Sequence, residues 1–480
     1  MSLKHIPPSL SRRGGALLVL FSLTWHPAHS ADLLDIYRLA QHNDSSFEAA
    51  RYALQATQEK VPQARAGLLP AVSASGSSNY TQSSAAYGGT SPVDRDVRAW
   101  TWNVQLTQPL IRLQNIFAYS ESQAIVKEAT AQFAQAEQAL ILRVTQAYFD
   151  VVVAQESIAV AQAQVQAMQA QLAQAKRGFE TGTHAITDMH EAQSRHALAT
   201  AQLVAARNEL ANKQAELEKI IGQDIGMLNT LQPAVVIPKP QPNDPHTWIA
   251  QARERNPAIL AQHFAVKAAE AEVSRNRAEH LPTLDLTASH GKNYSSGTTI
   301  NPTNYATSAS QQQLGVQLTI PLFSGGAINS RISEAIASRH KSQAELEAAR
   351  RQAAADARQA YAGIENGLAQ IEALQSAVES SQSAVKGNQV GFAVGIRMNI
   401  DVLNAEQQLY AAQRDLAKAR YDTLLQGLKL KAAAGTLSED DVLTVNALLG
   451  SVHETVEKLT PVTVNPILLK VQTQLISNLH

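Results

Sequence analysis

Residues that could do chemistry are few in this sequence and poorly spaced for catalysis. His190-Glu191 begins like the zinc pattern His-Glu-x-x-His, but position 194 is a serine, so the second histidine is missing. His184, His190 and His196 lack metal-ligand spacing and are better explained as a solvated helix face. Neither a P-loop nor a nucleophile elbow occurs. We therefore predict no enzymatic activity, no metal and no cofactor, and any energy source must lie in a partner.

Composition narrows the function classes further. The chain has 480 residues, with 40 Lys and Arg against 41 Asp and Glu, so it lacks the basic excess of a nucleic-acid-binding protein. It contains no cysteine, which excludes disulfides, thiol nucleophiles and cysteine-ligated metals. It also excludes a lipid-modified N-terminal cysteine. No run of 18 apolar residues predicts a spanning helix.

The first 30 residues have the pattern of a secretory signal peptide. Lys4, Arg12 and Arg13 precede a short apolar stretch at 16–23, and the small residues at 28 and 30 suit the −3 and −1 positions of a cleavage site. A short membrane anchor is the alternative. We expect the mature protein to leave the cytoplasm without lipidation.

The rest of the chain is a tandem repeat. The segment 104–110, Val-Gln-Leu-Thr-Gln-Pro-Leu, returns as Val-Gln-Leu-Thr-Ile-Pro-Leu at 316–322, and other matches keep the same offset within one residue. Five prolines between 233 and 245 mark a connector in which a helix cannot continue. The predicted organisation is a signal peptide (1–30), repeat 1 (31–222), a Pro-rich connector (223–244), repeat 2 (245–435), and an equatorial segment with the C-terminal tail (436–480).

Within each repeat the pattern predicts a helix, two strands, and a long helical hairpin. In repeat 1 the helices are expected at 33–66, 113–178 and 187–221. The long helix has a seven-residue period, in which an aliphatic position is followed three residues later by alanine or methionine. An ordinary amphipathic bundle is the alternative to a coiled coil. The seam positions are Val144, Val151, Ile158, Val165, Leu172, Ala147, Ala154, Ala161, Met168 and Ala175, with Ile364, Ile371, Val378 and Val385 in repeat 2.

Four segments with period-two alternation lie between the helices. In the clearest, Trp100, Trp102, Val104 and Leu106 alternate with small polar residues. A soluble sheet with one wet face would look the same. The ten-residue length and the tryptophans favour tilted membrane strands, with Trp100 and Trp102 in an aromatic girdle. The loops of the two hairpins are expected at about 83–96 and 295–307.

Four strands are too few to close a membrane barrel, for which about eight is the minimum. Because a membrane tolerates no open sheet edge, the protein must oligomerise and share the barrel. The fold class is therefore mixed α and β. Strands from several chains would complete a transmembrane barrel that continues into a long coiled-coil helical barrel.

Two glycines stand where the long helices should end. Gly182 and Gly395 are 213 residues apart, and each suits a left-handed turn at a helix C-terminus. Asp188 and Asp401 follow at equivalent positions. An acid in the first turn of a helix complements the helix dipole, and this structural role stands beside any functional one.

As a set, these features resemble the TolC family of outer-membrane channel-tunnel proteins over about 31–450. The resemblance is carried by the repeat and by four short motifs: Gly67-Leu68-Leu69-Pro70, residues 280–286, residues 320–326, and Val394-Gly395 with Asp401-Val402-Leu403. It implies a homotrimer with a 12-stranded barrel in outer-membrane lipid and a tunnel through the periplasm. It also implies two partners: a periplasmic adaptor, and an inner-membrane ABC or proton-driven transporter.

The same resemblance implies a periplasmic gate near the hairpin tips. By matching position, Thr187 and Asp188 would lie on the first hairpin, and Phe392 and Arg397 on the second. An Arg–carboxylate pair would suit a latch that a partner can exchange. The turns at Gly182 and Gly395 would face the adaptor, so they are the candidate docking sites.

The sequence departs from the family's gate at three points. Phe392 stands where tyrosine is frequent, so that hydroxyl contact is missing, and Arg177 stands where a neutral amide is common. Of the two acidic positions in the entrance cation ring, Asp401 keeps the acid, whereas the other is Asn404. We expect weaker cation selectivity than in relatives with both acids.

We interpret the chain as the outer-membrane exit duct of a tripartite export system. Type I protein secretion is favoured, because the missing lipid cysteine is typical of the unlipidated branch. Multidrug efflux is the alternative. A periplasmic adaptor or a coiled-coil structural protein is the remote one, and the four alternating strands speak against it.

Overall fold

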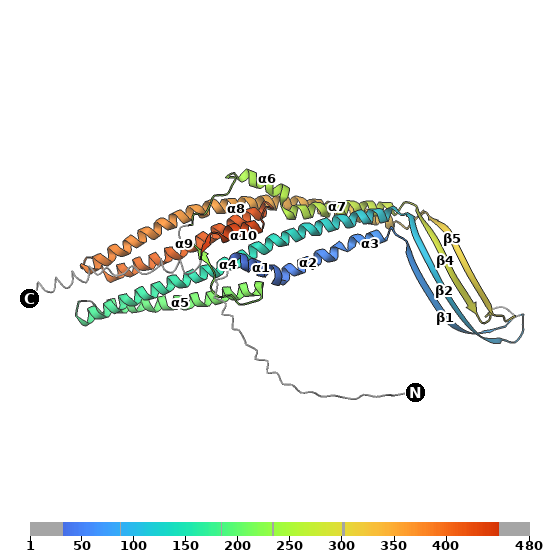
Figure 1. Cartoon of the computed structure of the whole chain (residues 1–480), viewed down its shortest axis with the longest axis horizontal. Coiled ribbons are helices and arrows are strands. Elements are labelled where there is room, and N and C mark those ends of the chain that lie inside the picture. The colour runs from blue at the N-terminus through green and yellow to red at the C-terminus, as the bar shows by residue number, and fades with distance from the viewer. Residues whose placement is uncertain (1–31, 87, 184, 233–234, 300–302, 451–480) are drawn as a thin grey trace, which may run out of the picture.

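The molecule is elongated, with a four-stranded sheet at one end and two long helical hairpins at the other (Figure 1). Some of the shorter helices lie at the middle, and others run from there to the sheet (Figure 1). The structure, a computed structural model, describes residues 32–86, 88–183, 185–232, 235–299 and 303–450. The expected signal peptide (1–30) and the end of the predicted tail (451–480) lie outside the described residues.

The segment expected as one helix at 33–66 is divided into three, so that expectation was wrong. Asp44 causes the first break, because its side chain accepts a hydrogen bond from the Phe47 N–H at 2.6 Å and caps the following helix. Repeat 2 breaks at the equivalent Asn256, whose side chain caps a helix that starts with Pro257. The helices are α1 (Leu33–Asn43), α2 (Ser45–Gln58) and α3 (Lys60–Ala66), and in repeat 2 α6 (Pro245–Arg255) and α7 (Pro257–Ala278).

The first hairpin consists of α4 (Leu113–Glu180) and α5 (Ile186–Ile221). Both agree with the expected helices to within two residues. At about 1.5 Å per residue, the 68 residues of α4 span about 100 Å. The predicted heptad seam is confirmed as a buried stripe, in which Val144, Val151 and Met168 are at most 2% exposed.

The second hairpin consists of α8 (Ala327–Ala393) and α9 (Asn399–Ala433). Its predicted seam is likewise buried at Ile364, Ile371 and Val385. The two hairpins are not independent rods, because α4 packs against α9 as well as against α5.

The four strands form one antiparallel sheet. β1 (Ala71–Ala85) and β2 (Val93–Ile111) make the first hairpin, and β4 (Thr283–Ser295) and β5 (Thr307–Thr319) make the second. The order is β1-β2-β4-β5, so β1 and β5 form the two edges. The first loop is shorter than expected, because Ala85 already pairs with Val93 and the charged residues at 94–96 belong to β2.

The register divides the sheet into two chemically different faces. Leu106 lies opposite Val72 on β1 and Ala288 on β4, and Ala288 lies opposite Leu314 on β5. The other face carries Ser, Thr, Asn and Gln, as at Gln105. We call the first of these the apolar face. Its apolar members are Val72, Ala74, Val104, Leu106, Leu284, Leu286, Ala288, Leu314, Val316 and Leu318.

The main hydrophobic core lies at the waist, where the hairpins meet the short helices. It draws on α1, α4, α5, α9 and α10 (Glu439–Asn446), and on the short pair β3 (Thr230–Leu231) and β6 (Leu449–Gly450). A second core joins α6, α7, α8 and the end of α9. The connector and the expected equatorial segment therefore pack into the waist.

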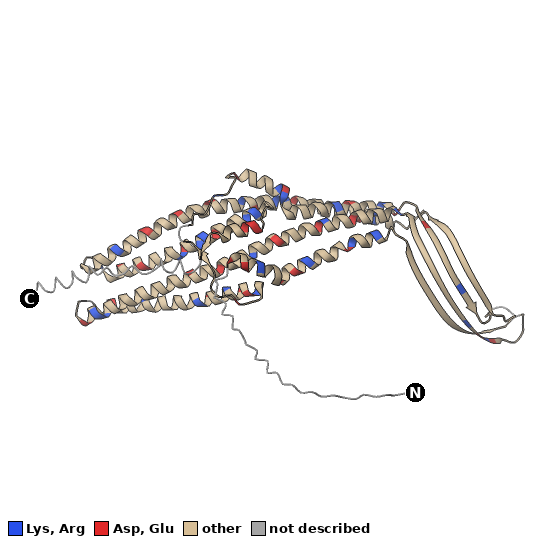
Figure 2. Ribbon diagram, in the orientation of Figure 1, with Lys and Arg blue, Asp and Glu red and all other residues tan. Residues whose placement is uncertain are grey.

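Charged residues are scattered along the helices and sparse on the strands, where Lys and Arg lie toward the hairpin loops (Figure 2). Across the described part of the chain, every helix is too short or too polar to qualify as a membrane-crossing segment.

Candidate functional site

The two hairpins end in the same backbone motif. Gly182 has φ 75° and Gly395 has φ 76°, which confirms the predicted left-handed turns. The N–H of Gly182 donates to the Phe179 carbonyl, and the N–H of Thr183 donates to the Gly178 carbonyl. The second hairpin repeats both hydrogen bonds from Gly395 and from Ile396. Both turns are exposed, so they present two equivalent tips.

The acids after these turns have different local roles. Asp401 accepts a hydrogen bond from the Met398 N–H at 3.2 Å and so caps α9, which confirms its structural role at this helix start. Asp188 lies in the first turn of α5, where the helix dipole favours its charge, but makes no capping hydrogen bond. Thr187 beside it is exposed.

The expected latch residues of the second hairpin lie on or beside its turn. Phe392 is in the last turn of α8 and half-buried. Arg397 is exposed in the turn before α9, and its guanidinium lies 4.0 Å from the carboxylate of Asp401 in the first turn of that helix. Among the described residues, no hydrogen bond or ion pair links Arg397 with Thr187 or Asp188. Within one chain, the Arg397–carboxylate pair therefore stays inside the second hairpin, between its turn and the start of α9.

A different arginine bridges the two hairpins. Arg195 of α5 donates from Nη1 to Oε1 of Gln407 at 2.8 Å and from Nη2 to Oδ1 of Asn404 at 3.3 Å. Glu191, one turn earlier on α5, accepts from its Nε at 2.8 Å and orients the guanidinium. The bridge therefore ends on Asn404, the position expected to be the neutral member of the entrance ring. We call Arg195, Asn404 and Gln407 the hairpin bridge.

Next to the hairpin bridge, an apolar contact also holds the two hairpins together. Met168 of α4, Ala199 of α5 and Leu403 of α9 form a small core in which each is at most 2% exposed. Sequence analysis placed Met168 in the seam of its own hairpin. The structure shows that the same residue also packs against the other hairpin.

A carboxylate is buried next to this core. Glu406 of α9 is 4% exposed, and its Oε1 accepts hydrogen bonds from Gln171 of α4 at 3.4 Å and Gln389 of α8 at 3.2 Å. Its Oε2 has no hydrogen-bond partner among the described residues. Burial raises the pKa of Glu406, and the two amide hydrogen bonds only partly oppose this shift. One titratable group therefore connects three of the four long helices.

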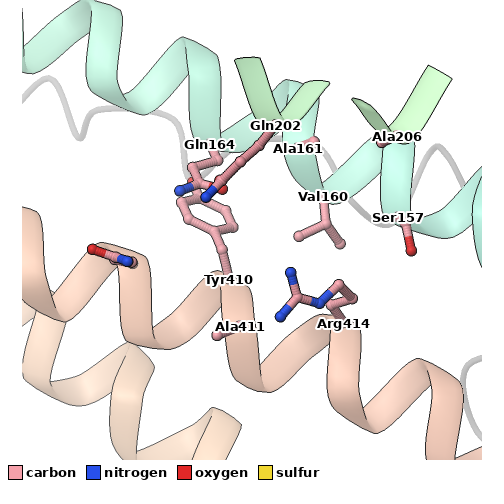
Figure 3. Close-up of a pocket in the computed structure, with 10 residues that line it drawn as sticks. Ser157, Val160, Ala161, Gln164, Gln202, Ala206, Tyr410, Ala411 and Arg414 are labelled. Carbon is pink, nitrogen blue, oxygen red and sulfur yellow. The ribbon is translucent and has the colours of Figure 1, made fainter. Parts of the chain in front are cut away.

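A shallow groove of about 160 Å³ follows along the same junction. Figure 3 shows Tyr410 and Arg414 of α9 facing Gln164 and Val160 of α4, with Gln202 reaching in from α5. The Tyr410 hydroxyl lies 3.4 Å from the Ala163 carbonyl and donates to it. The junction between the hairpins is thus polar and incompletely filled, which suits a contact that can be broken and remade.

The tryptophans of the sheet lie on the apolar face. Trp100 is 38% exposed and stacks on Tyr294 with ring centroids 5.7 Å apart. Trp102 is 37% exposed, and His290 approaches it edge-on at 5.2 Å. An aromatic row therefore crosses β2 and β4 on the side of the sheet toward the hairpin loops.

In the described residues, no cluster of three or more His, Cys, Asp or Glu could hold a metal ion. The residues missed by sequence analysis are Arg195, Gln407 and Glu406. They contact residues far away in sequence, 209 and 212 positions for the two contacts of Arg195, and no short motif marks them. The repeat offset near the hairpin tips is 213, which pairs Arg195 with Gln408 rather than with Gln407, so the repeat does not point to this contact.

Comparisons with known proteins agree with this geometry. The family model described as "Outer membrane efflux protein" matches residues 36–223 and 248–436. The chain is 32% identical to the proteases secretion protein PrtF of Dickeya chrysanthemi, covering 91% of this chain and 95% of that one. It is also 32% identical to the outer membrane protein TolC of Vibrio cholerae, covering 90% and 96%. The crystal structure of the Campylobacter jejuni CmeC outer membrane channel matches with a TM-score of 0.73 at 17% identity, over 92% and 97% of the two chains, which shows a shared fold.

Proposed function

Because the chain belongs to the family of outer membrane efflux proteins, we propose that it is the exit duct of a tripartite export system. One observation carries this proposal. Two matched helical hairpins, joined along α4 and α9, continue from an antiparallel sheet with two free edges. A chain built in this way is a segment of a tube, and identical neighbours would complete it.

The complete duct would be a homotrimer. Three copies of β1-β2-β4-β5 would give a 12-stranded barrel in outer-membrane lipid, with the apolar face outward and the polar face lining the lumen. The six hairpins would continue the barrel through the periplasm. The chain would reach this location through its signal peptide, unlipidated, since it has no cysteine.

The hairpin tips would form the entrance. We propose that Gly182 and Gly395 mark the surface on which a periplasmic adaptor docks, and that an inner-membrane ABC or proton-driven transporter supplies energy. Thr187, Asp188, Phe392 and Arg397 would act as gate residues between neighbouring chains, because within one chain Arg397 pairs with Asp401. The hairpin bridge would add a second contact inside each chain.

Type I protein secretion is the favoured cargo route. The match to PrtF supports it, because that protein is described as a proteases secretion protein and the match covers 95% of its length. Multidrug efflux is the alternative, favoured by the family description.

A deletion strain tests the choice between these routes. Its secreted proteins and its drug susceptibility are compared with those of the parent and of a strain complemented with the intact gene. Loss of one exported protein with unchanged drug tolerance supports type I secretion. Drug hypersensitivity with an intact secretome would instead show that the duct serves multidrug efflux. A soluble periplasmic pool of the protein, without a heat-modifiable trimer in the outer membrane, would reject the duct itself.

A further inference from the structure

We propose that the apolar face carries a binding site for the phosphate of a phosphorylated lipid headgroup, formed by Lys292, His290 and Arg98 beside Trp100 and Trp102. This inference rests on the proposed function, because it requires the apolar face to contact lipid. We call these five residues the rim patch. The register places all five on the same face of β2 and β4, since Trp100 pairs with Tyr294, Trp102 with Lys292, and Val104 with His290.

The rim patch lies at the height where an outer lipid leaflet ends. Lys292 pairs with Ser310, ten residues before the exposed Ile320 at the helical end of the sheet. At about 3.3 Å per residue and a tilt of about 40°, that separation is about 25 Å in height, the height of the apolar band of a membrane barrel. The side chains between these levels are mostly aliphatic, as at Leu314, Val316 and Leu318. Lys292 therefore stands at the border between hydrocarbon and headgroups.

A lysine on this face needs an anionic partner from outside the chain. Its Nζ lies 6.0 Å from the centroid of the Trp100 ring, which holds the ammonium group against the aromatic row. Within the described residues, no carboxylate lies within ion-pair distance of Lys292. A cation on the lipid-facing surface is costly at the midplane and tolerated only near the headgroups. A lipid phosphate would supply the missing charge.

Arg98 adds a second positive charge on the loop side of Lys292, and His290 places an imidazole ring on the other side. The Arg98 N–H donates to the Ser296 hydroxyl at 2.8 Å, which fixes β2 against the end of β4 at this level. Two acids on the same face, Asp94 and Asp96, lie further toward the loop. The Tyr80 hydroxyl contacts Asp96. The basic groups therefore lie between these acids and the aliphatic band, where a lipid phosphate would sit.

The site belongs to one chain. β2 and β4 are the two central strands, so a neighbouring copy that pairs with β1 or β5 would leave them uncovered. The aromatic rings complete the match, because tryptophan and tyrosine place their amphipathic rings at headgroup level. The chemistry fits an anionic phosphorylated lipid better than a zwitterionic lipid, whose own ammonium group would repel Lys292 and Arg98.

The test measures thermal unfolding of the purified full-length protein in detergent, titrated with bis-phosphorylated lipid A, with the same lipid after dephosphorylation, or with inorganic phosphate. We expect phosphorylated lipid A to raise Tm and the other two to have little effect. Lys292→Gln should weaken the apparent affinity about tenfold, as expected for one charge-assisted contact. Lys292→Arg should restore it. Lys341→Gln, on an exposed lysine of α8, is the matched control and should behave as wild type.

Each other outcome overturns the inference. Equal stabilisation by the dephosphorylated lipid would mean that only the acyl chains are bound. Equal stabilisation by inorganic phosphate would mean an ordinary anion site. An unchanged response in Lys292→Gln combined with Arg98→Gln would place the phosphate elsewhere. Trimer formation and outer-membrane fractionation are measured on the same samples, so failure of the duct itself is seen separately from failure of the rim patch.

Discussion

Glu406 places an ionisable carboxyl group in surroundings that disfavour its charge. Its carboxyl group is buried among three long helices, and burial raises its pKa above the usual 4.5. The folded chain therefore holds this proton more tightly than the unfolded chain does. Stability from this group is fully present below pH 4.5 and is lost as the pH rises toward the raised folded pKa.

Glu406→Gln should stabilise the hairpins at pH 8, because glutamine keeps the hydrogen bonds from Gln171 and Gln389 without a buried charge. A gain of 1 kcal/mol would raise Tm by about 1 °C in a chain of 480 residues. The gain should shrink as the pH falls and should disappear well below pH 4.5, where the wild-type carboxyl is neutral in both states. Thermal unfolding across this pH range measures it, with the exposed Glu372→Gln as control. An equal Tm difference at every pH would show that the charge is irrelevant.

Arg195 is the residue that ties one hairpin to the other. Arg195→Gln should remove two hydrogen bonds made by a charged group, worth about 1.5 kcal/mol or more per chain, or roughly tenfold in a closed-to-open ratio. We expect a higher closed-state conductance in planar bilayers. Arg207→Gln, on an exposed arginine about three turns along the same helix, is the control. Unchanged conductance in both variants would show that the hairpin bridge does not help to hold the gate closed.

Substitution of Asn404 allows a test of cation selectivity at the proposed entrance. With a neutral amide there and the Arg195 guanidinium 3.3 Å away, the wild type should show weak cation selectivity. Asn404→Asp should raise the cation-to-anion permeability ratio several-fold, and combining it with Arg195→Gln should raise the ratio further. Reversal potentials in a salt gradient measure the ratio. A strongly cation-selective wild type would refute this account.

At the scale of elements, the waist depends on two tyrosines that fasten the connector to the long helices. The Tyr421 hydroxyl of α9 donates to Glu156 of α4 at 2.6 Å and accepts the N–H of Leu231 in β3 at 2.9 Å. Tyr148 of α4 donates to the Asn229 carbonyl at 2.9 Å. The connector between the repeats is thus part of the core.

Tyr421→Phe should therefore destabilise the chain by about 1–3 kcal/mol, because it leaves a buried N–H and a buried carboxyl oxygen without their partner. Burial already raises the pKa of Glu156, and losing the hydroxyl should raise it further. Denaturant unfolding followed by circular dichroism measures the loss. Tyr52→Phe, at a tyrosine 58% exposed on α2, should be neutral. Equal stability of the two variants would show that the waist does not rely on this clamp.

Elements with a strong period were predictable from sequence, and contacts between distant elements were not. The seven-residue period identified the long helix α4, and α5 was expected after the glycine turn; both were correct to within two residues. The two-residue period located all four strands. The break at Asp44 was missed although Asp-Ser-Ser is an N-cap pattern, because the surrounding composition favours helix throughout. The hairpin bridge was unpredictable, since α5 and α9 meet only through tertiary packing.

At the scale of the whole molecule, the free edges of β1 and β5 make a direct prediction. Within one chain these strands are separated by β2 and β4, about 14 Å at about 4.8 Å per strand, too far for a disulfide. In this cysteine-free chain, Ser77→Cys combined in turn with Gln311→Cys or Gln313→Cys should form disulfides only between copies. Denaturing gels should show covalent dimers and trimers in at least one register. Single-cysteine chains are the control, and monomers alone in every register would contradict the shared barrel.

The same unpaired edges have a genetic consequence. If every barrel needs three competent chains, one defective chain inactivates a trimer that also contains two normal chains. In a cell that expresses equal amounts of normal and edge-defective protein, only about one assembly in eight would contain normal chains alone. An edge defect should therefore behave as a dominant allele, whereas a defect that unfolds the chain before assembly should be recessive.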